Sequence, residues 1–68
     1  MTESDFTPRQ QQMLACLSRG LENKVIAREI GISVKTVEQH IRLVLRRGGW
    51  RRRYEAGLWM VRREHAKV

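Results

Sequence analysis

The stretch GISVKTVEQH, residues 31–40, contains a helix stop followed almost at once by a helix start. Gly31 suits the left-handed backbone just past a helix end, where a Cβ atom would cost energy. Ser33 can accept a hydrogen bond from the free N–H groups that open the next helix. One helix therefore stops, a short turn follows and another helix begins, which predicts a helix-turn-helix joint.

Further helices are indicated on both sides of this joint. Thr7, Pro8 and Gln10 form a strong helix start: Thr7 caps, Pro8 needs no N–H partner, and Gln10 can reach back as in a capping box. Asn23 is the next expected cap, and the glycine pair at 48–49 should stop the third helix. Apolar residues recur at helical spacing with no strand pattern and no internal repeat, so the expected fold class is all-α.

The expected domain covers residues 7–65 and holds four helices, at about residues 8–19, 24–30, 34–47 and 51–65. We expect a flexible N-terminus at residues 1–6 and a frayed C-terminus at 66–68. The start at Met1 favours a complete chain, although a domain cut from a larger protein is the other interpretation. A stand-alone chain of this length has no room for a second domain that senses a signal, so any control of its activity would come from its concentration or from a partner.

Composition argues against several classes of protein. The single cysteine, Cys16, cannot form an internal disulfide, and Cys and His are too few for a structural zinc site. No paired carboxylates or nucleophile–base constellation indicates catalysis, so we expect no catalytic residue, metal or cofactor. No apolar run reaches membrane-spanning length and the first five residues do not resemble a signal peptide, so we expect a cytoplasmic protein.

The positive charge is concentrated in the second half of the chain. The net charge is +7, yet residues 1–41 hold five basic and five acidic side chains and contribute none of it. Six arginines and no acid occur from Arg42 to Arg53. Charge runs are usually solvated surface, but arginine used in place of lysine favours forked contacts with phosphates. We therefore expect Arg46, Arg47, Arg52 and Arg53 to contact a polyanion.

The third helix has two different faces at about 100° per residue. Val37, Ile41, Val44 and Leu45 cluster on one side and should face the core. The opposite side carries Lys35, Gln39, Arg42 and Arg46, with Glu38 on its flank. Arginine suits guanine, glutamine suits adenine, and glutamate suits the cytosine amino group, so this face can read base edges in a major groove. Leu43 also projects away from the core, and contact with a thymine methyl is one role open to it.

The fourth helix has more apolar surface than one core contact can use. Tyr54, Leu58 and Val61 form one stripe, and Trp59 and Met60 lie beside it. Part of this surface should remain for a partner, so Tyr54, Leu58, Trp59 and Val61 are the expected dimer interface. Because two +7 chains repel each other, the homodimer would form mainly on DNA.

Residues 6–41 resemble the DNA-binding domain of LuxR-type (GerE-like) bacterial transcription regulators. The similar features are Thr7-Pro8-Arg9, Gly20-Leu21, Asn23-Lys24, Ile26-Ala27, Ile30-Gly31-Ile32-Ser33, and Thr36-Val37 followed by His40; YEA at 54–56 continues the match. The resemblance implies a four-helix domain whose third helix enters the major groove of double-stranded DNA. It also implies dimerisation through the fourth helix and binding to inverted repeats.

By position, the resemblance implies that Glu38, Gln39 and Arg42 face bases. It places Lys24, Lys35, Thr36 and His40 near phosphates. From the residues alone, a single histidine at the edge of the core face, such as His40, is more often a packed side chain than a ligand.

The stretch RRGGWRRR, residues 46–53, departs from the family, which usually has a Lys-Leu-Gly-Val-like turn there. Gly48 takes the place of a core leucine, and losing a buried leucine outright would cost about 2–5 kcal/mol. We therefore expect Trp50 to fold back into that space. The other interpretation leaves Trp50 exposed or stacked on DNA.

The function that these observations favour is a sequence-specific DNA-binding transcriptional regulator that is not an enzyme. The main alternative is a sigma-factor-like or partner-docking module that binds RNA polymerase or another regulator, since such modules share the helix-turn-helix. A membrane-surface module using the basic fourth helix is a third class, which we do not favour.

Overall fold

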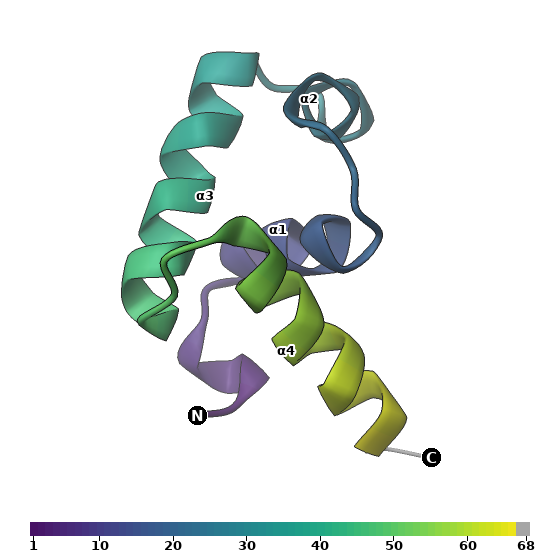
Figure 1. Ribbon diagram of the computed structural model, residues 1–68. Coiled ribbons are helices and arrows are strands. Elements are labelled where there is room, and N and C mark those ends of the chain that lie inside the picture. The colour runs from purple at the N-terminus through teal and green to yellow at the C-terminus, as the bar shows by residue number, and fades with distance from the viewer. Residues whose placement is uncertain (67–68) are drawn as a thin grey trace.

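The structure is a computed structural model that describes the backbone of residues 1–66 and the side chains of residues 1–63. Its elements are a short 3-10 helix η1 (Glu3–Asp5) followed by α1 (Pro8–Ser18), α2 (Asn23–Ile30), α3 (Val34–Gly48) and α4 (Arg53–Ala66). The four α-helices, with no strand in the described residues, confirm the all-α fold class (Figure 1). Within residues 1–66, no helix combines the length and apolar character needed to cross a membrane.

The helix ends differ from the expected ones mainly at the start of α4. The sequence predicts a start at residue 51, but the helix begins at Arg53. The carboxylate of Glu55 accepts a hydrogen bond from the backbone N–H of Arg51 at 3.0 Å, which fixes the turn that precedes the helix. At the other end of the chain, residues 67 and 68 of the expected frayed C-terminus lie outside the described residues.

Two of the expected caps are present in the geometry predicted from sequence. The Thr7 hydroxyl accepts from the Gln10 N–H at 3.1 Å, and the Gln10 side-chain oxygen accepts from the Thr7 N–H at 2.9 Å. The Ser33 hydroxyl accepts from the Thr36 N–H at 3.1 Å. Gly31 has φ 81°, so the left-handed residue between α2 and α3 is the glycine that the sequence indicated.

The expected cap at Asn23 is wrong. Glu22 is the N-cap of α2, its side chain makes no capping hydrogen bond, and Asn23 is the first helical residue. The side-chain oxygen of Asn23 instead accepts a hydrogen bond from Arg53 at 2.6 Å. Local sequence suggested a cap because asparagine is a good N-cap, but a contact with a residue 30 positions away determines where this side chain lies.

The core is formed by side chains from all four α-helices and from the N-terminal segment. Its members are Phe6, Met13, Leu14, Cys16, Leu17, Ile26, Ala27, Val37, Ile41, Val44, Ala56 and Met60. Burial, followed by the charge of Glu29, raises the pKa of the Cys16 thiol. This thiol therefore stays protonated at neutral pH, as expected of a small core side chain and not of a reactive one.

The N-terminal segment belongs to the fold, in contrast to the flexible N-terminus expected at residues 1–6. Phe6 is only 3% exposed. Its ring stacks on Trp50 with ring centroids 6.0 Å apart and meets Trp59 at 5.7 Å, while the two tryptophans lie 5.5 Å from each other. The Gln11 amide also donates to the backbone oxygens of Glu3 and Phe6, at 3.0 and 2.9 Å. We call Phe6, Trp50 and Trp59 the aromatic cluster.

Trp50 folds back over Gly48, which confirms the expectation for the RRGGWRRR stretch. A Cβ atom added at Gly48 would collide with the six-membered ring of Trp50. Trp50 is half-buried and packs against the core. The indole therefore fills the space that a leucine at position 48 would occupy, and it joins the end of α3 to the N-terminal segment.

The α4 helix buries a narrower face than its apolar run suggested. Ala56, Gly57 and Met60 are buried. A Cβ atom at Gly57 would lie 2.6 Å from the backbone oxygen of Leu17, so the absence of a side chain lets α4 approach α1 closely. Tyr54 and Leu58 point away from this contact and are 67% and 44% exposed.

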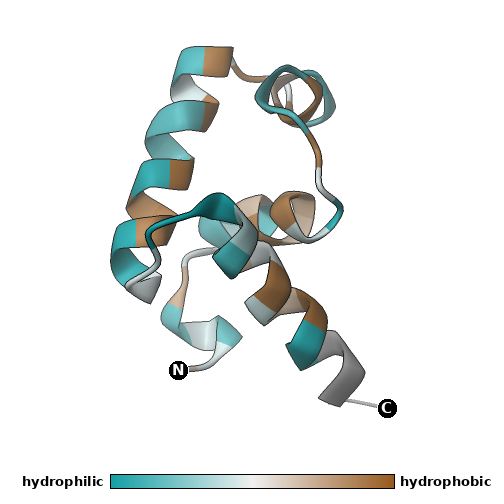
Figure 2. Cartoon of the chain, viewed as in Figure 1, coloured by the Kyte–Doolittle hydropathy of each residue, from teal (hydrophilic) through white to brown (hydrophobic). Residues whose placement is uncertain are grey.

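Helix α3 lies at one edge of the molecule. Within residues 1–66, the other helices contact it from one side only, and no other element covers its outer side (Figure 1). In Figure 2 the outer side of α3 is mainly hydrophilic and its inner side hydrophobic. The fold thus holds α3 by its buried Val37, Ile41 and Val44 and leaves its other face in solvent.

Candidate nucleic-acid interface

The outer face of α3 presents polar side chains that have no partners in the described part of the chain. Lys35, Glu38, Gln39, Arg42 and Arg46 are all exposed. Within residues 1–63, none of these side chains makes a hydrogen bond or an ion pair. The base-reading residues expected from sequence therefore lie together on one exposed face, where their donors and acceptors are free for a ligand.

Two of the expected phosphate-contacting residues lie at the edge of this face. Thr36 and His40 are both half-buried. The Thr36 hydroxyl shares a hydrogen bond of 2.8 Å with the Ser33 hydroxyl, so Thr36 also supports the start of α3. The Thr36 N–H itself is bonded to the Ser33 hydroxyl, but the first turn of α3 still leaves backbone N–H groups without an intrahelical acceptor, which suits an anion.

Helix α2 adds positive charge near the start of α3. Lys24 is exposed, as the phosphate-contacting role expected from sequence requires. Arg28, to which no sequence motif pointed, is exposed four residues later and therefore shares its helix face. The spacing of two basic residues by four positions is the signal that would have found it.

Some of the arginines after Arg42 are unpaired at the surface, and others make hydrogen bonds within the domain. Arg46 and Arg52 are exposed and have no partner within the described side chains. Arg47 is also exposed, but its Nε donates to the backbone oxygen of Asp5. This bond ties the end of α3 to the N-terminal segment and leaves the terminal nitrogens of the Arg47 guanidinium for a phosphate.

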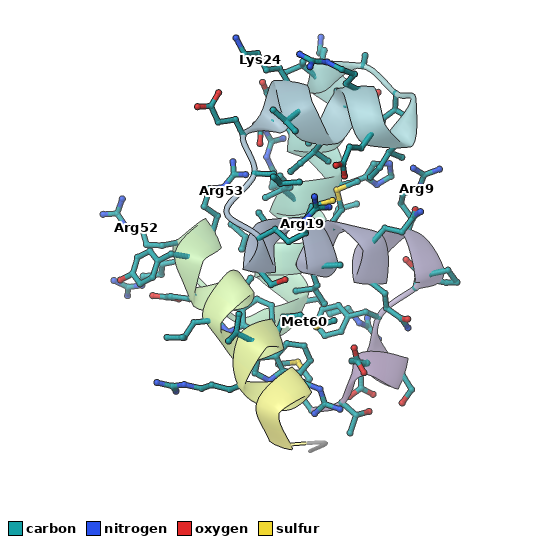
Figure 3. All side chains as sticks on the ribbon, turned by 90° about the vertical axis from the view of Figure 1, so that its right-hand side faces the viewer. Arg9, Arg19, Lys24, Arg52, Arg53 and Met60 are labelled. Atoms are coloured by element: carbon teal, nitrogen blue, oxygen red, sulfur yellow. The ribbon has the colours of Figure 1, made fainter. Side chains whose placement is uncertain are left out.

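Arg53 differs from the phosphate-contacting role that the arginine run suggested. Its two terminal nitrogens donate to the Asn23 side-chain oxygen at 2.6 Å and to the Leu21 backbone oxygen at 2.9 Å. The forked guanidinium therefore fastens the start of α4 to the segment between α1 and α2. Figure 3 shows Lys24, Arg53 and Arg52 along one side of the molecule, with Arg52 projecting outward.

We expect Arg53→Ala to lower the free energy of unfolding by about 1–2 kcal/mol, because it leaves two acceptors without their charged donor at a half-buried site. Arg53→Lys should not restore this stability, since an ammonium group cannot reproduce the fork. Urea unfolding followed by far-UV circular dichroism measures both effects.

Arg52→Ala is the matched control, with the expected unfolding free energy within about 0.5 kcal/mol of the parent chain. Its expected effect is on DNA binding: weaker affinity for every sequence and a salt dependence flattened by about one unit of slope. Equal losses of stability in the two alanine variants would contradict the different roles of Arg52 and Arg53.

The described residues offer a protruding helix face rather than a cavity. No pocket is found in them, and no group of three or more His, Cys, Asp or Glu side chains within them could hold a metal ion. A helix with an exposed polar face and arginines at its exit can enter a groove and hold the anionic walls on either side.

Residues 4–60 match the family described as "Bacterial regulatory proteins, luxR family". The chain is 37% identical over 62 residues to the nitrate/nitrite response regulator protein NarL of Escherichia coli, which covers 87% of the chain and 29% of NarL. It is 42% identical over 51 residues to the HTH-type transcriptional activator RamA of Corynebacterium glutamicum, covering 75% of the chain and 18% of RamA. The chain is also 41% identical over 51 residues to the response regulator Rre1 of Synechocystis, and this match covers 75% of the chain and 22% of Rre1. The chain thus spans less than a third of each of these relatives.

Proposed function

We propose a function for this chain as a member of the luxR family of bacterial regulatory proteins, to which it belongs as a helix-turn-helix DNA-binding domain. The chain recognises a specific duplex sequence by placing α3 in the major groove. The observation that carries the proposal is the outer face of α3, which is exposed and unpaired within the described side chains while the inner face is buried. Regulation of transcription, not catalysis, is the activity of this family.

The proposed contacts follow from side-chain chemistry. Arg42 donates to guanine, Gln39 pairs with adenine, and Glu38 accepts from the cytosine amino group. A second set of exposed or half-buried residues fixes the domain on the phosphates: Lys24, Arg28, Lys35, Thr36, His40, Arg46, Arg47 and Arg52. Arg53 is left out of this set because its guanidinium is held within the fold.

Gln39→Ala and Arg42→Ala are each expected to lose about 1–3 kcal/mol of binding free energy on the preferred duplex, because each removes a bidentate base contact. Binding to random duplex should be nearly unchanged for Gln39→Ala and slightly weaker for Arg42→Ala. Fluorescence anisotropy titrations on both duplexes measure the difference.

Gln12→Ala is the matched control for Gln39→Ala, since Gln12 is an exposed glutamine on α1. It should bind both duplexes as the parent chain does. If the two α3 variants lost as much affinity for random as for preferred DNA, the outer face of α3 would not be the reading surface.

Selection of the 68-residue chain on random duplexes, followed by sequencing of the bound fraction, tests the whole proposal. We expect an enriched inverted repeat, bound by a homodimer that α4 holds together. Because the chain itself is used, enrichment would also establish that it binds without a further domain. Failure to enrich any motif would count against sequence-specific binding, and a single non-repeated motif would count against the homodimer.

The exposed pair Tyr54 and Leu58 supports α4 as the dimer surface, since the residues lie four positions apart on one helix face. Val61, one turn further, is half-buried. Trp59 is less suited to this role than the sequence suggested, because its ring packs in the aromatic cluster and lies under the Arg63 guanidinium at 4.9 Å. The proposal also places the chain in the cytoplasm, where chromosomal DNA is found.

A further inference from the structure

The outer face of α3 contains an apolar side chain that the proposed contacts leave without a role. Leu43 is 48% exposed and is not among the hydrophobic residues that pack against the core. Apart from Val34 at the very start of the helix, it is the one large hydrophobic residue that α3 exposes within the described side chains. A leucine therefore stands in water on the surface that would meet DNA, where the free domain gains nothing from it.

The position of Leu43 relative to Gln39 determines what it can reach. Four residues on a helix correspond to about 6 Å along the axis and about 40° around it. A helix with its side chains is about 10–12 Å across, and the major groove is about 12 Å wide. When one side chain points to the floor of the groove, side chains on either side of it around the helix therefore also contact the groove. When Gln39 meets a base edge, Leu43 also lies inside the groove.

The chemistry of the groove leaves one suitable partner for a leucine there. Base edges in the major groove present nitrogen and oxygen donors and acceptors, and their one apolar group is the C5 methyl of thymine. Arg46 and Arg47, which follow on the next turn, are exposed and provide the phosphate contacts that would hold this part of the helix against the strand.

We propose that Leu43 is a specificity-determining residue that contacts the C5 methyl of a thymine within about two base pairs of the base that Gln39 reads, since 6 Å corresponds to about two steps of 3.4 Å. This inference rests on the proposed function, in which α3 lies in the major groove.

The experiment replaces the methyl group itself. Once selection has given a preferred half-site, each thymine in it is changed in turn to deoxyuridine, which lacks only the C5 methyl. Binding of the parent chain and of Leu43→Ala is measured on each single half-site duplex. At one thymine close to the Gln39-dependent position, the parent chain should bind the deoxyuridine duplex about fourfold more weakly, the change expected for one buried methyl. Leu43→Ala should bind both duplexes equally.

Two further variants separate the contact from the fold. Leu43→Met keeps an apolar side chain of similar volume and should retain the thymine preference. Leu58→Ala truncates a similarly exposed leucine on α4, 44% exposed, and should also retain it on a single half-site. Circular dichroism on each variant monitors the fold.

The outcomes separate this inference from the function on which it rests. A preferred half-site at which the parent chain is indifferent to every missing methyl would overturn the role of Leu43 and leave the proposed function intact. The same holds if Leu43→Ala still discriminates thymine from deoxyuridine. If selection gave no preferred sequence, the proposed function would fail and this inference with it.

Discussion

Replacing Phe6 by alanine is expected to unfold most of the domain at 25 °C. The ring is 3% exposed and contacts both tryptophans, and removing such a phenylalanine from a core costs about 3–5 kcal/mol. The core of a domain this small rarely supplies more than about 3–5 kcal/mol of net stability. The cost of the substitution is therefore at least as large as the net stability, so most molecules should be unfolded. Tryptophan emission is a direct measurement, because the chain has two tryptophans and both lie in the aromatic cluster.

Tyr54→Ala is the control for Phe6→Ala. It also removes an aromatic ring, but one that is 67% exposed, so the free energy of unfolding should change by no more than about 0.5 kcal/mol. A Phe6→Ala variant that unfolds in urea at the same midpoint as the parent chain would show that the N-terminal segment is dispensable. That result would restore the sequence-based expectation of a flexible N-terminus.

The features that could be predicted from sequence are those determined by a few adjacent residues. Thr7 and Ser33 cap helices through hydrogen bonds that span three positions. Gly31 adopts a left-handed backbone conformation at the end of α2, which follows from the residue type alone. The two faces of α3 follow from helical periodicity, so the sequence alone is enough to place Gln39 and Arg42 on its outer side. Local rules are sufficient where the partners are close in sequence.

The structure differs from the sequence-based expectations where distant residues decide the position of a side chain. Phe6 looks like part of a polar tail until Trp50 and Trp59 are brought beside it. Arg53 looks like part of a charge run, and its fork is occupied only because the fold brings Leu21 and Asn23 within reach. Trp50 could be placed correctly because a missing leucine at Gly48 implies a space that some large side chain must fill.

The second large effect is expected at the α4 surface, where Leu58→Asp should remove cooperative binding to a duplex with two half-sites. Leu58 is 44% exposed and lies on the same face as Tyr54, so a symmetric pair of α4 helices would have to bury a hydrated carboxylate in place of an apolar side chain. Affinity for the two-site duplex should fall by at least about 100-fold, because the second chain no longer benefits from the high effective concentration on DNA. Affinity for one half-site should fall only by the effect of one added negative charge.

Gln12→Asp is the control for that charge, since it makes the same change of net charge at an exposed position on α1. It should weaken binding to the one-site and two-site duplexes equally and leave cooperative binding intact. Val61→Asp is a poorer test than Leu58→Asp, because Val61 is half-buried and its replacement also disturbs the fold.

The order of assembly follows from the charges around this surface. Arg51, Arg52 and Arg62 are exposed on or beside α4, and two chains of net charge +7 repel each other in solution. Phosphates of the bound duplex reduce that repulsion, so pairing should be weak in free solution and strong on a two-site duplex. Because salt screens the repulsion between the chains and also their attraction to DNA, raising the salt concentration should favour the free dimer and weaken DNA binding. Sedimentation of the free chain at low and high salt measures its dimerisation, and titrations of both duplexes at the same salt concentrations measure DNA binding. A folded Leu58→Asp variant that binds the two-site duplex with the affinity and stoichiometry of the parent chain would mean that α4 does not join the two subunits.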